Sequence, residues 1–158
     1  MKRASGVGVA VIIIAVVALV IATAIIIISS TIQSRTTLNI GDGVFTAKLA
    51  TTPSQRDKGL GDTTLAVDQA LIYAYPSDSK WPVSVIGTKA SVDIIWLNQD
   101  KKVVYIVTNA SPDISSQTVF SPSTAARYVI EVAAGSVDNL NIKADSTAVF
   151  EISGTEIK

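Results

Sequence analysis

The 158-residue chain contains no histidine and no cysteine, and only one methionine. Without cysteine there can be no disulfide, no thiol nucleophile, no thiolate metal site and no lipid attached to an N-terminal cysteine. Without histidine the chain lacks the side chain whose pKa suits proton transfer near neutral pH, and the commonest nitrogen ligand of zinc and copper. Many classes of enzyme are therefore excluded, and we expect neither a cofactor nor a metal site.

Basic residues are also few outside the N-terminal region. Lys2, Arg3 and Arg35 flank one apolar block, whereas residues 36–158 carry ten basic and thirteen acidic side chains. Nucleic-acid binding requires a clustered basic face, so we expect no nucleic-acid partner. Beyond the apolar block the chain has room for one ordinary domain of about 120 residues.

The apolar block runs from Val7 to Ile28, without a charge and with one hydroxyl, that of Thr23. As a helix it would extend roughly 33 Å, which is close to the hydrocarbon thickness of a bilayer. A helix also satisfies its own backbone hydrogen bonds, as lipid requires. We therefore predict a transmembrane helix over residues 7–28, with membrane lipid as its partner.

The charges around this helix predict its orientation. Lys2, Arg3 and the α-amino group precede it and only Arg35 follows it closely, so residues 1–6 are expected in the cytoplasm and the C-terminal domain outside it. The alternative is a cleaved signal peptide, because Ala22-Thr23-Ala24 fits the pattern of small residues at a cleavage site. Cleavage there would leave four isoleucines at the new terminus, so we favour a retained signal anchor and a single-pass membrane protein.

The rest of the chain is predicted to be a polar tether over residues 29–37 and an extracytoplasmic domain over residues 38–158. Thr52 and Gln55 form a capping box around Pro53, which predicts a short helix that ends at Gly59. Ser136 is the expected N-cap of a second helical turn. Apolar alternation and turn residues predict strands over 44–50, 70–75, 92–97, 102–107, 128–132 and 147–152. The expected fold class is mostly β, a small barrel or sandwich with one or two short helices.

Four segments in this order resemble the domain of unknown function 192 family of bacteria and archaea, over roughly residues 44–152. They are Thr52 to Leu60, Ala70 to Tyr73, Val92 to Leu97 and Ala126 to Gly135, of which the last, Ala-Arg-Tyr-Val-Ile-Glu-Val-Ala-Ala-Gly, is the most specific. The resemblance implies a compact, mostly β domain, often exported or anchored, without an agreed activity.

The chain departs from the family pattern at three places. Where the family usually has Trp-Met-Lys and a polar residue, this chain has Ser84-Val85-Ile86-Gly87, and Ser91 replaces a proline. Asp145-Ser146 stands where the family has a glycine-aspartate pair. If the family builds a polar site on the Trp-Met-Lys segment, this chain lacks its cation and its aromatic side chain there, and the nearest tryptophan is Trp81.

Several polar side chains are candidates for a site. Asp93 lies in an apolar run, where a buried carboxylate must be paired or hydrogen-bonded. It could be a general base or a ligand-binding group, or it could be held by backbone amides or by Arg127 or Lys89 at a strand end. Arg127 and Glu131 are four apart on a predicted strand, so they share a face and could form a cluster with Arg56; the simpler alternative is a surface ion pair. We predict a ligand-binding patch without catalytic residues, formed by Arg56, Trp81, Asp93, Arg127 and Glu131.

Three functions from different classes fit these observations. The first is a membrane-anchored extracytoplasmic binding or interaction module, with an envelope glycan or a protein as its partner. The second is an envelope-directed hydrolase or lyase that uses Asp93 and Glu131, which requires both carboxylates in one pocket. The third is a structural protein that assembles through its transmembrane helix, which predicts an oligomer that dissociates once residues 1–35 are removed.

Overall fold

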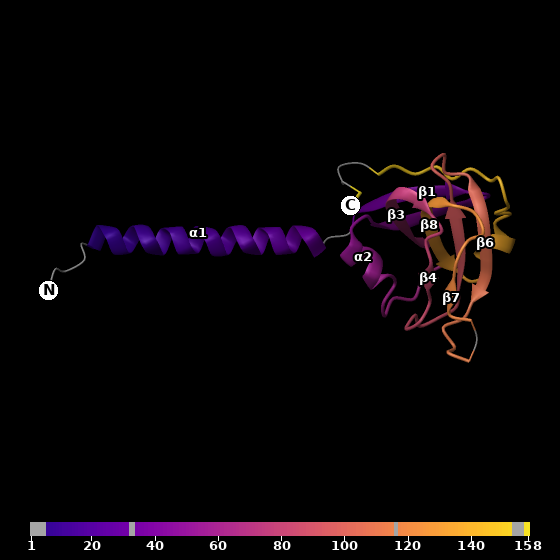
Figure 1. The fold of residues 1–158 in the computed structure, drawn as a ribbon, viewed down its shortest axis with the longest axis horizontal. Helices are drawn as coiled ribbons and strands as arrows, with labels where there is room; N and C mark the ends of the chain where they lie inside the picture. Colours follow the sequence, from indigo (N-terminus) through magenta and orange to yellow (C-terminus); the bar gives the residue numbers. More distant parts are fainter. Residues whose placement is uncertain (1–5, 32–33, 116, 153–156) are drawn as a thin grey trace. The chain divides into compact units, whose positions relative to one another are not determined.

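The computed structural model describes residues 6–31, 34–115, 117–152 and 157–158, in two units, 1–33 and 34–158 (Figure 1). The first unit contains helix α1, Gly6–Thr31, whose 26 residues include the predicted helix over 7–28. Its side chains are described from Ala10 to Thr23. Within the part of the chain that the structure describes, no helix reaches the combined length and apolarity that a membrane span requires.

The second unit is built on one six-stranded mixed sheet in the order β1-β2-β3-β8-β5-β6. Its strands are β1 (Arg35–Ile40), β2 (Gly43–Ala50), β3 (Gln69–Ser79), β5 (Val92–Leu97), β6 (Val103–Ala110) and β8 (Ala126–Ala133). Two short strands, β4 (Val83–Ser84) and β7 (Val119–Phe120), form a separate pair. The predicted mostly β fold with short helices is confirmed, but in the described chain the sheet does not close into a barrel.

The strand β1 begins inside the segment that the sequence predicts to be a tether. Arg35 pairs with Lys48 and Leu38 with Phe45 in the antiparallel ladder between β1 and β2. Leu38 and Ile40 alternate with exposed residues and are buried in the core. Residues 35–37 are therefore part of the sheet.

Helix α2, Pro53–Lys58, connects β2 to β3, which run parallel. A parallel pair requires such a crossover, whereas antiparallel neighbours can be joined by a tight turn. The predicted capping box is confirmed: the Thr52 side chain accepts from the Gln55 amide and the Gln55 side chain accepts from the Thr52 amide. Gly59 ends this helix with a positive φ of 52°.

Strand β3 continues past Pro76, where the sequence predicts its end. Ala74 pairs with Tyr128 and Ser79 with Ala126, and the register shifts between these two pairs. Because proline has no amide hydrogen, the ladder is interrupted there although the chain stays extended.

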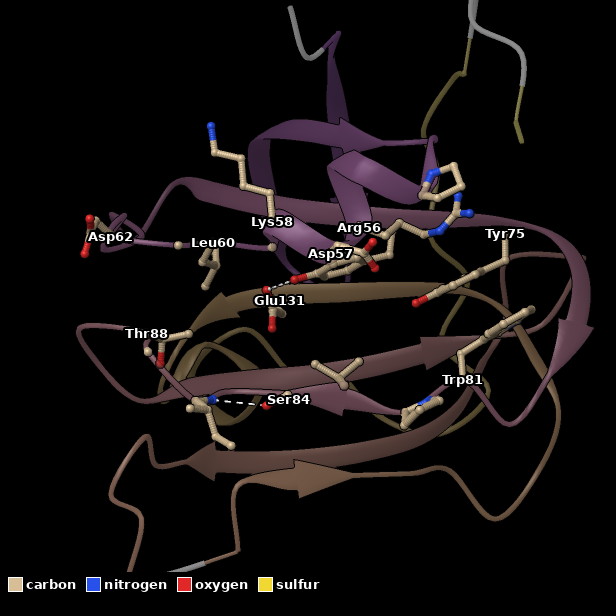
Figure 2. A pocket seen from close by; sticks show the side chains of 18 residues that line it. Arg56, Asp57, Lys58, Leu60, Asp62, Tyr75, Trp81, Ser84, Thr88 and Glu131 are labelled. Atoms are coloured by element: carbon tan, nitrogen blue, oxygen red, sulfur yellow. Dashed lines mark hydrogen bonds between the residues drawn. The ribbon is translucent and has the colours of Figure 1, made fainter. Parts of the chain in front are cut away.

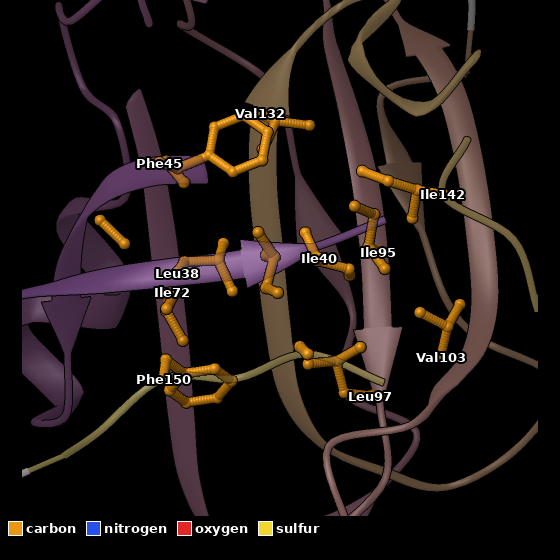
Figure 3. Packing of buried hydrophobic residues seen from close by; sticks show 14 of the residues in the cluster. Leu38, Ile40, Phe45, Ile72, Ile95, Leu97, Val103, Val132, Ile142 and Phe150 are labelled. Carbon is orange, nitrogen blue, oxygen red and sulfur yellow. The ribbon is translucent and has the colours of Figure 1, made fainter. Parts of the chain in front are cut away.

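The predicted C-terminal strand over 147–152 is wrong. This segment makes isolated bridges instead, from Thr147 to Lys102 beside β6 and from Val149 to Asn39 in β1. It crosses one face of the sheet and buries Ala148 and Phe150 there. Figure 3 shows Phe150 against Leu97 and Ile72 from the sheet.

The two faces of the sheet carry two different cores. One face, covered by the C-terminal segment and by helix α3 (Ser136–Asn139), packs Leu38, Phe45, Ile72, Ile95 and Ile130 into a closed cluster. The other face, covered by α2 and the β4 region, packs Leu71, Tyr73, Ile94, Trp96 and Val129. Both faces of β5 are thus buried, which explains the nearly continuous apolar run of this strand.

Candidate functional site

A cavity of about 800 Å³ opens on the second face, between the α2 region, residues 53–62, and the β4 region, residues 81–88 (Figure 2). Its size is in the range of small-molecule sites. The α2 region contributes one rim, the sheet contributes the floor and the β4 region contributes the other rim. The main lining residues of the α2 rim are Arg56, Asp57, Lys58, Leu60 and Asp62. Those of the floor are Tyr73, Tyr75 and Glu131, and those of the β4 rim are Trp81, Ser84, Ile86 and Thr88.

The carboxyl group of Glu131 lies at the floor of this cavity (Figure 2). The residue is 0% exposed, and its Oε2 accepts a hydrogen bond of 2.7 Å from the Tyr73 hydroxyl. Its Oε1 is buried and has no hydrogen-bond partner within the described chain. Since buried polar atoms are nearly always paired in folded proteins, this oxygen is an exception that requires an explanation.

Burial raises the pKa of Glu131 and the pKa values of the two tyrosines near it. Loss of hydration raises the pKa of Glu131 to about 7, although the hydrogen bond from Tyr73 opposes the shift. Burial also raises the pKa of Tyr73, with a further contribution from Glu131. The pKa of Tyr75 is raised mainly by burial, which Arg56 opposes and Glu131 reinforces. Glu131 is thus a carboxyl that changes its charge near neutral pH.

The aromatic wall of the cavity is a stack of three side chains. The rings of Tyr75 and Trp81 are parallel within 6° and their centroids are 4.1 Å apart. The guanidinium of Arg56 lies 4.8 Å from the centroid of the Tyr75 ring. The Trp81 indole also donates to the Ser77 carbonyl, and its own carbonyl accepts from Trp96, so the wall is fixed to the core.

Arg56 holds the α2 region against the sheet. Its Nη1 donates to the carbonyls of Thr51 and Ala74, both at 2.9 Å, and its Nη2 donates to the carbonyl of Lys158 at 2.6 Å. These bonds tie the helix to the end of β2, to β3 and to the last residue of the chain. The position of Arg56 at the cavity is therefore set by backbone groups.

Gly59 is fitted to the floor of the site. A Cβ atom there would lie 3.0 Å from the Tyr73 hydroxyl, which is tighter than nine in ten real Cβ contacts. The positive φ of 52° also favours glycine. A larger residue at this position would press on the hydroxyl that donates to Glu131.

Asp93, the second predicted carboxylate, lies outside the cavity and on the other face of the sheet. It pairs with Val132 across the ladder, whereas Glu131 pairs with Ile94, so the two side chains point in opposite directions. Both Asp93 oxygens accept backbone hydrogen bonds, from Asn109 at 2.8 Å and from Val137 at 2.9 Å. The two carboxylates therefore do not form a shared site.

The contacts of Asp93 explain its burial and correct the prediction for Ser136. The register of the β5–β6 ladder shifts between Val92 and Ile94, and the Asn109 amide beside this bulge donates to Asp93. The N-cap of α3 is Gly135, which has no side chain to cap the helix, and Ser136 is already helical. Asp93 accepts the Val137 amide in place of a cap side chain.

Arg127, the fifth predicted residue, forms an ion pair outside the cavity. Its Nε donates to Asp78 at 2.6 Å, and the two side chains are 27% and 36% exposed. Of the predicted patch, the structure brings together Arg56, Trp81 and Glu131 and leaves out Asp93 and Arg127. Across the described ranges, no group of three or more acidic side chains could hold a metal ion.

Tyr73 and Tyr75 are site residues that the sequence analysis does not single out. They stand two apart on a strand, so their side chains share a face, and this spacing is visible in the sequence. The segment Ser84 to Gly87, where the family pattern has a tryptophan and a lysine, also borders the cavity. In this chain the β4 rim therefore lacks that lysine.

Comparison with known proteins decides the family. The DUF192 family, described as an uncharacterized ACR, matches residues 36–150. The chain belongs to the DUF192 family. The resemblance is thereby confirmed for the domain, and the match covers the whole six-stranded sheet except Arg35, the first residue of β1.

Two solved structures share the fold. A "putative transcription regulator" from Sinorhizobium meliloti 1021 is 21% identical, with a TM-score of 0.69 over 75% of this chain and 95% of that one. A protein of unknown function from Novosphingobium aromaticivorans DSM 12444 is 24% identical, with a TM-score of 0.65 over 74% of this chain and 84% of that one. A comparison with curated proteins gives no match. At these identities the two structures show the fold of the chain and not an activity.

Proposed function

We propose that this DUF192 protein is a membrane-anchored, extracytoplasmic binding module that holds a small polar ligand in the cavity above Glu131. The observation that carries the proposal is the unpartnered Oε1 of Glu131 at the floor of a preformed cavity. A ligand that donates a hydrogen bond to this oxygen would remove the cost of leaving it buried without a partner. The parallel rings of Tyr75 and Trp81 offer a rigid, flat wall beside it.

The geometry favours a binding module over the hydrolase or lyase considered above. Acid–base cleavage by two carboxylates needs both groups on the same substrate, roughly 5 to 9.5 Å apart for glycosides. Asp93 and Glu131 instead point to opposite faces of the sheet. Both Asp93 oxygens are also occupied by backbone amides.

The membrane part of the proposal rests on α1 and on the sequence around it. The nine described large aliphatic side chains of α1 are 51–68% exposed. In water such an apolar surface would be costly, and a bilayer would cover it on all sides. The hydroxyl of Thr23 donates to the Val20 carbonyl within the helix, so it needs no water. Lys2 and Arg3 before the helix favour an extracytoplasmic domain.

Fractionation of cells that produce the full chain tests the membrane part. We expect the intact chain in the membrane pellet, released by detergent and not by high salt. Protease added to intact spheroplasts should digest the domain. A matched variant, Ile14→Lys with Val17→Lys, places two charges at the helix centre, where each costs about 3 kcal/mol on insertion, and should lower the membrane-bound fraction. Recovery of the unprocessed wild-type chain in the soluble fraction would refute the anchor.

Ligand binding is tested by thermal unfolding of the detergent-solubilised chain with a panel of envelope-derived sugars and peptides. A true ligand at about 100 times its Kd should stabilise the chain by roughly 3 kcal/mol. Trp81→Ala, which removes the outer ring of the wall, should reduce this stabilisation. Stabilisation that is equal in the wild type and in Trp81→Ala would show that the cavity is not the binding site.

A further inference from the structure

When Glu131 is ionised, the floor of the cavity carries a negative charge. No cation of the described chain forms an ion pair with it. Tyr73, which carries no charge, donates to Oε2, and Oε1 has no partner among the described residues. The ion pair found in the described chain joins Arg127 to Asp78 and leaves Glu131 aside. A buried carboxylate is normally paired with a cation or fully hydrogen-bonded, and Glu131 is neither.

The two cations beside the cavity do not fill this role. Arg56 directs both Nη atoms to the carbonyls of Thr51, Ala74 and Lys158. Lys58 is exposed at the rim, and Figure 2 shows its side chain pointing away from Glu131. A positive charge at Oε1 would therefore have to come from a bound molecule.

Other groups around the cavity favour such a charge. The hydroxyl of Tyr75 points toward the interior of the cavity in Figure 2 and makes no hydrogen bond within the described residues, so it can accept one from a ligand. Asp57 and Asp62 stand on the α2 rim and add negative potential at the entrance. The outer ring of the aromatic stack offers a π surface to a cation or to its carrier.

We propose that the cavity binds a small ligand with a primary ammonium group, which donates a hydrogen bond to Oε1 of Glu131 and supplies the missing positive charge. This inference rests on the binding role proposed above and adds the chemical class of the ligand. A hydroxyl group could also donate to Oε1, but it would leave the charge unbalanced. Both bonds to an ionised Glu131 would be charge-assisted, but only the ammonium adds a positive charge that attracts the carboxylate, so the ammonium is the better match.

Three sugars of one ring type test this inference, because they differ mainly in the group at one position. Glucosamine carries the ammonium, N-acetylglucosamine carries a neutral amide and glucose carries a hydroxyl. Their binding to the full chain in detergent micelles is measured by calorimetry at pH 7. We expect glucosamine to bind at least about tenfold more tightly than the other two.

Substitutions test whether the preference for glucosamine depends on Glu131. Glu131→Gln keeps the shape of the side chain and removes its charge, so the tenfold preference for glucosamine should disappear. Glu151→Gln makes the same chemical change at an exposed position outside the cavity and should keep the preference. Circular dichroism confirms that each variant is folded. If Glu131→Gln does not fold, the variant Trp81→Ala, at the partly exposed wall, is used in its place and should weaken glucosamine binding.

The outcomes separate this inference from the broader proposal. Equal binding of all three sugars, lost in Trp81→Ala, would overturn the ammonium and keep the binding module. A glucosamine preference that persists in folded Glu131→Gln would also overturn the inference. If none of the three sugars binds at millimolar concentration, the inference fails, whereas the module stands or falls with the panel of sugars and peptides described above.

Discussion

Two fully buried carboxylates lie next to each other in the central strands, one on each face of the sheet, and their surroundings differ. Asp93, on the closed face, accepts one backbone amide on each oxygen. Glu131, on the face with the cavity, accepts one hydroxyl and has one oxygen without a partner in the described chain. Burial alone is therefore a poor guide to function. The two groups differ in whether the fold supplies all their hydrogen bonds. Only Glu131 has an oxygen that can still accept a hydrogen bond from a ligand.

The largest difference should appear when each carboxylate is removed. Asp93→Ala leaves the Asn109 and Val137 amides without an acceptor, and we expect a loss of about 4 kcal/mol in the free energy of unfolding. Glu131→Ala at pH 8 removes an ionised group that is already poorly satisfied, so its loss should be much smaller. Urea unfolding of both variants measures the two values. Equal losses would contradict the comparison.

The stability of the folded chain should also depend on pH through Glu131. The pKa of Glu131 is raised from 4.5 to about 7 in the folded chain, so the folded state binds more protons than the unfolded state between these values. Stability should therefore fall as the pH rises from about 4.5 to about 7, by roughly 3 kcal/mol from this group, and should be constant with respect to it above that range. Glu131→Gln should lose this slope and be more stable than the wild type at pH 8.

Urea unfolding at a series of pH values measures this slope. Glu151→Gln is the control, since that side chain is exposed, and it should keep the wild-type profile. A wild-type chain that becomes more stable between pH 4.5 and 7, with Glu131→Gln unchanged from it, would show that Glu131 is ionised without cost.

A smaller effect is expected from the tyrosines. Tyr73→Phe removes the hydrogen bond to Oε2 and should cost about 1 to 2 kcal/mol at pH 8. Tyr75→Phe removes a hydroxyl that makes no bond within the described chain, so it should change the stability by less than about 0.5 kcal/mol. Thermal unfolding of the two matched variants checks this. A larger loss in Tyr75→Phe than in Tyr73→Phe would mean that the hydrogen bond to Glu131 contributes little.

Local signals in the sequence predicted the local structure well. The capping box at Thr52, the strands around Phe45 and the hairpin of β5 and β6 depend on neighbouring residues, and all are confirmed. The predicted strand over 147–152 is wrong because its partners lie at the two edges of the sheet, and edge pairing is a property of the whole fold. The predicted end of β3 at Pro76 is wrong because tertiary pairing with β8 resumes after the proline.

Only part of the candidate site could be predicted, because the register between strands is also a property of the whole fold. Strand periodicity places Glu131 on one face of β8, but it does not say on which face of the neighbouring strand Asp93 lies. That depends on the register between β5 and β8, which pairs Asp93 with Val132. Trp81 and Arg56 meet at the cavity through Tyr75, whose contacts no local pattern reveals.

A carbon-13 NMR titration of the Glu131 carboxyl in the full chain tests whether the fold leaves this group incompletely satisfied, with the signal assigned by its absence in Glu131→Gln. A carboxyl that the fold leaves incompletely satisfied should titrate with a pKa of about 7. A pKa near 4.5, the value of an ordinary glutamate, would contradict the account, because the carboxylate would then be fully stabilised without any ligand.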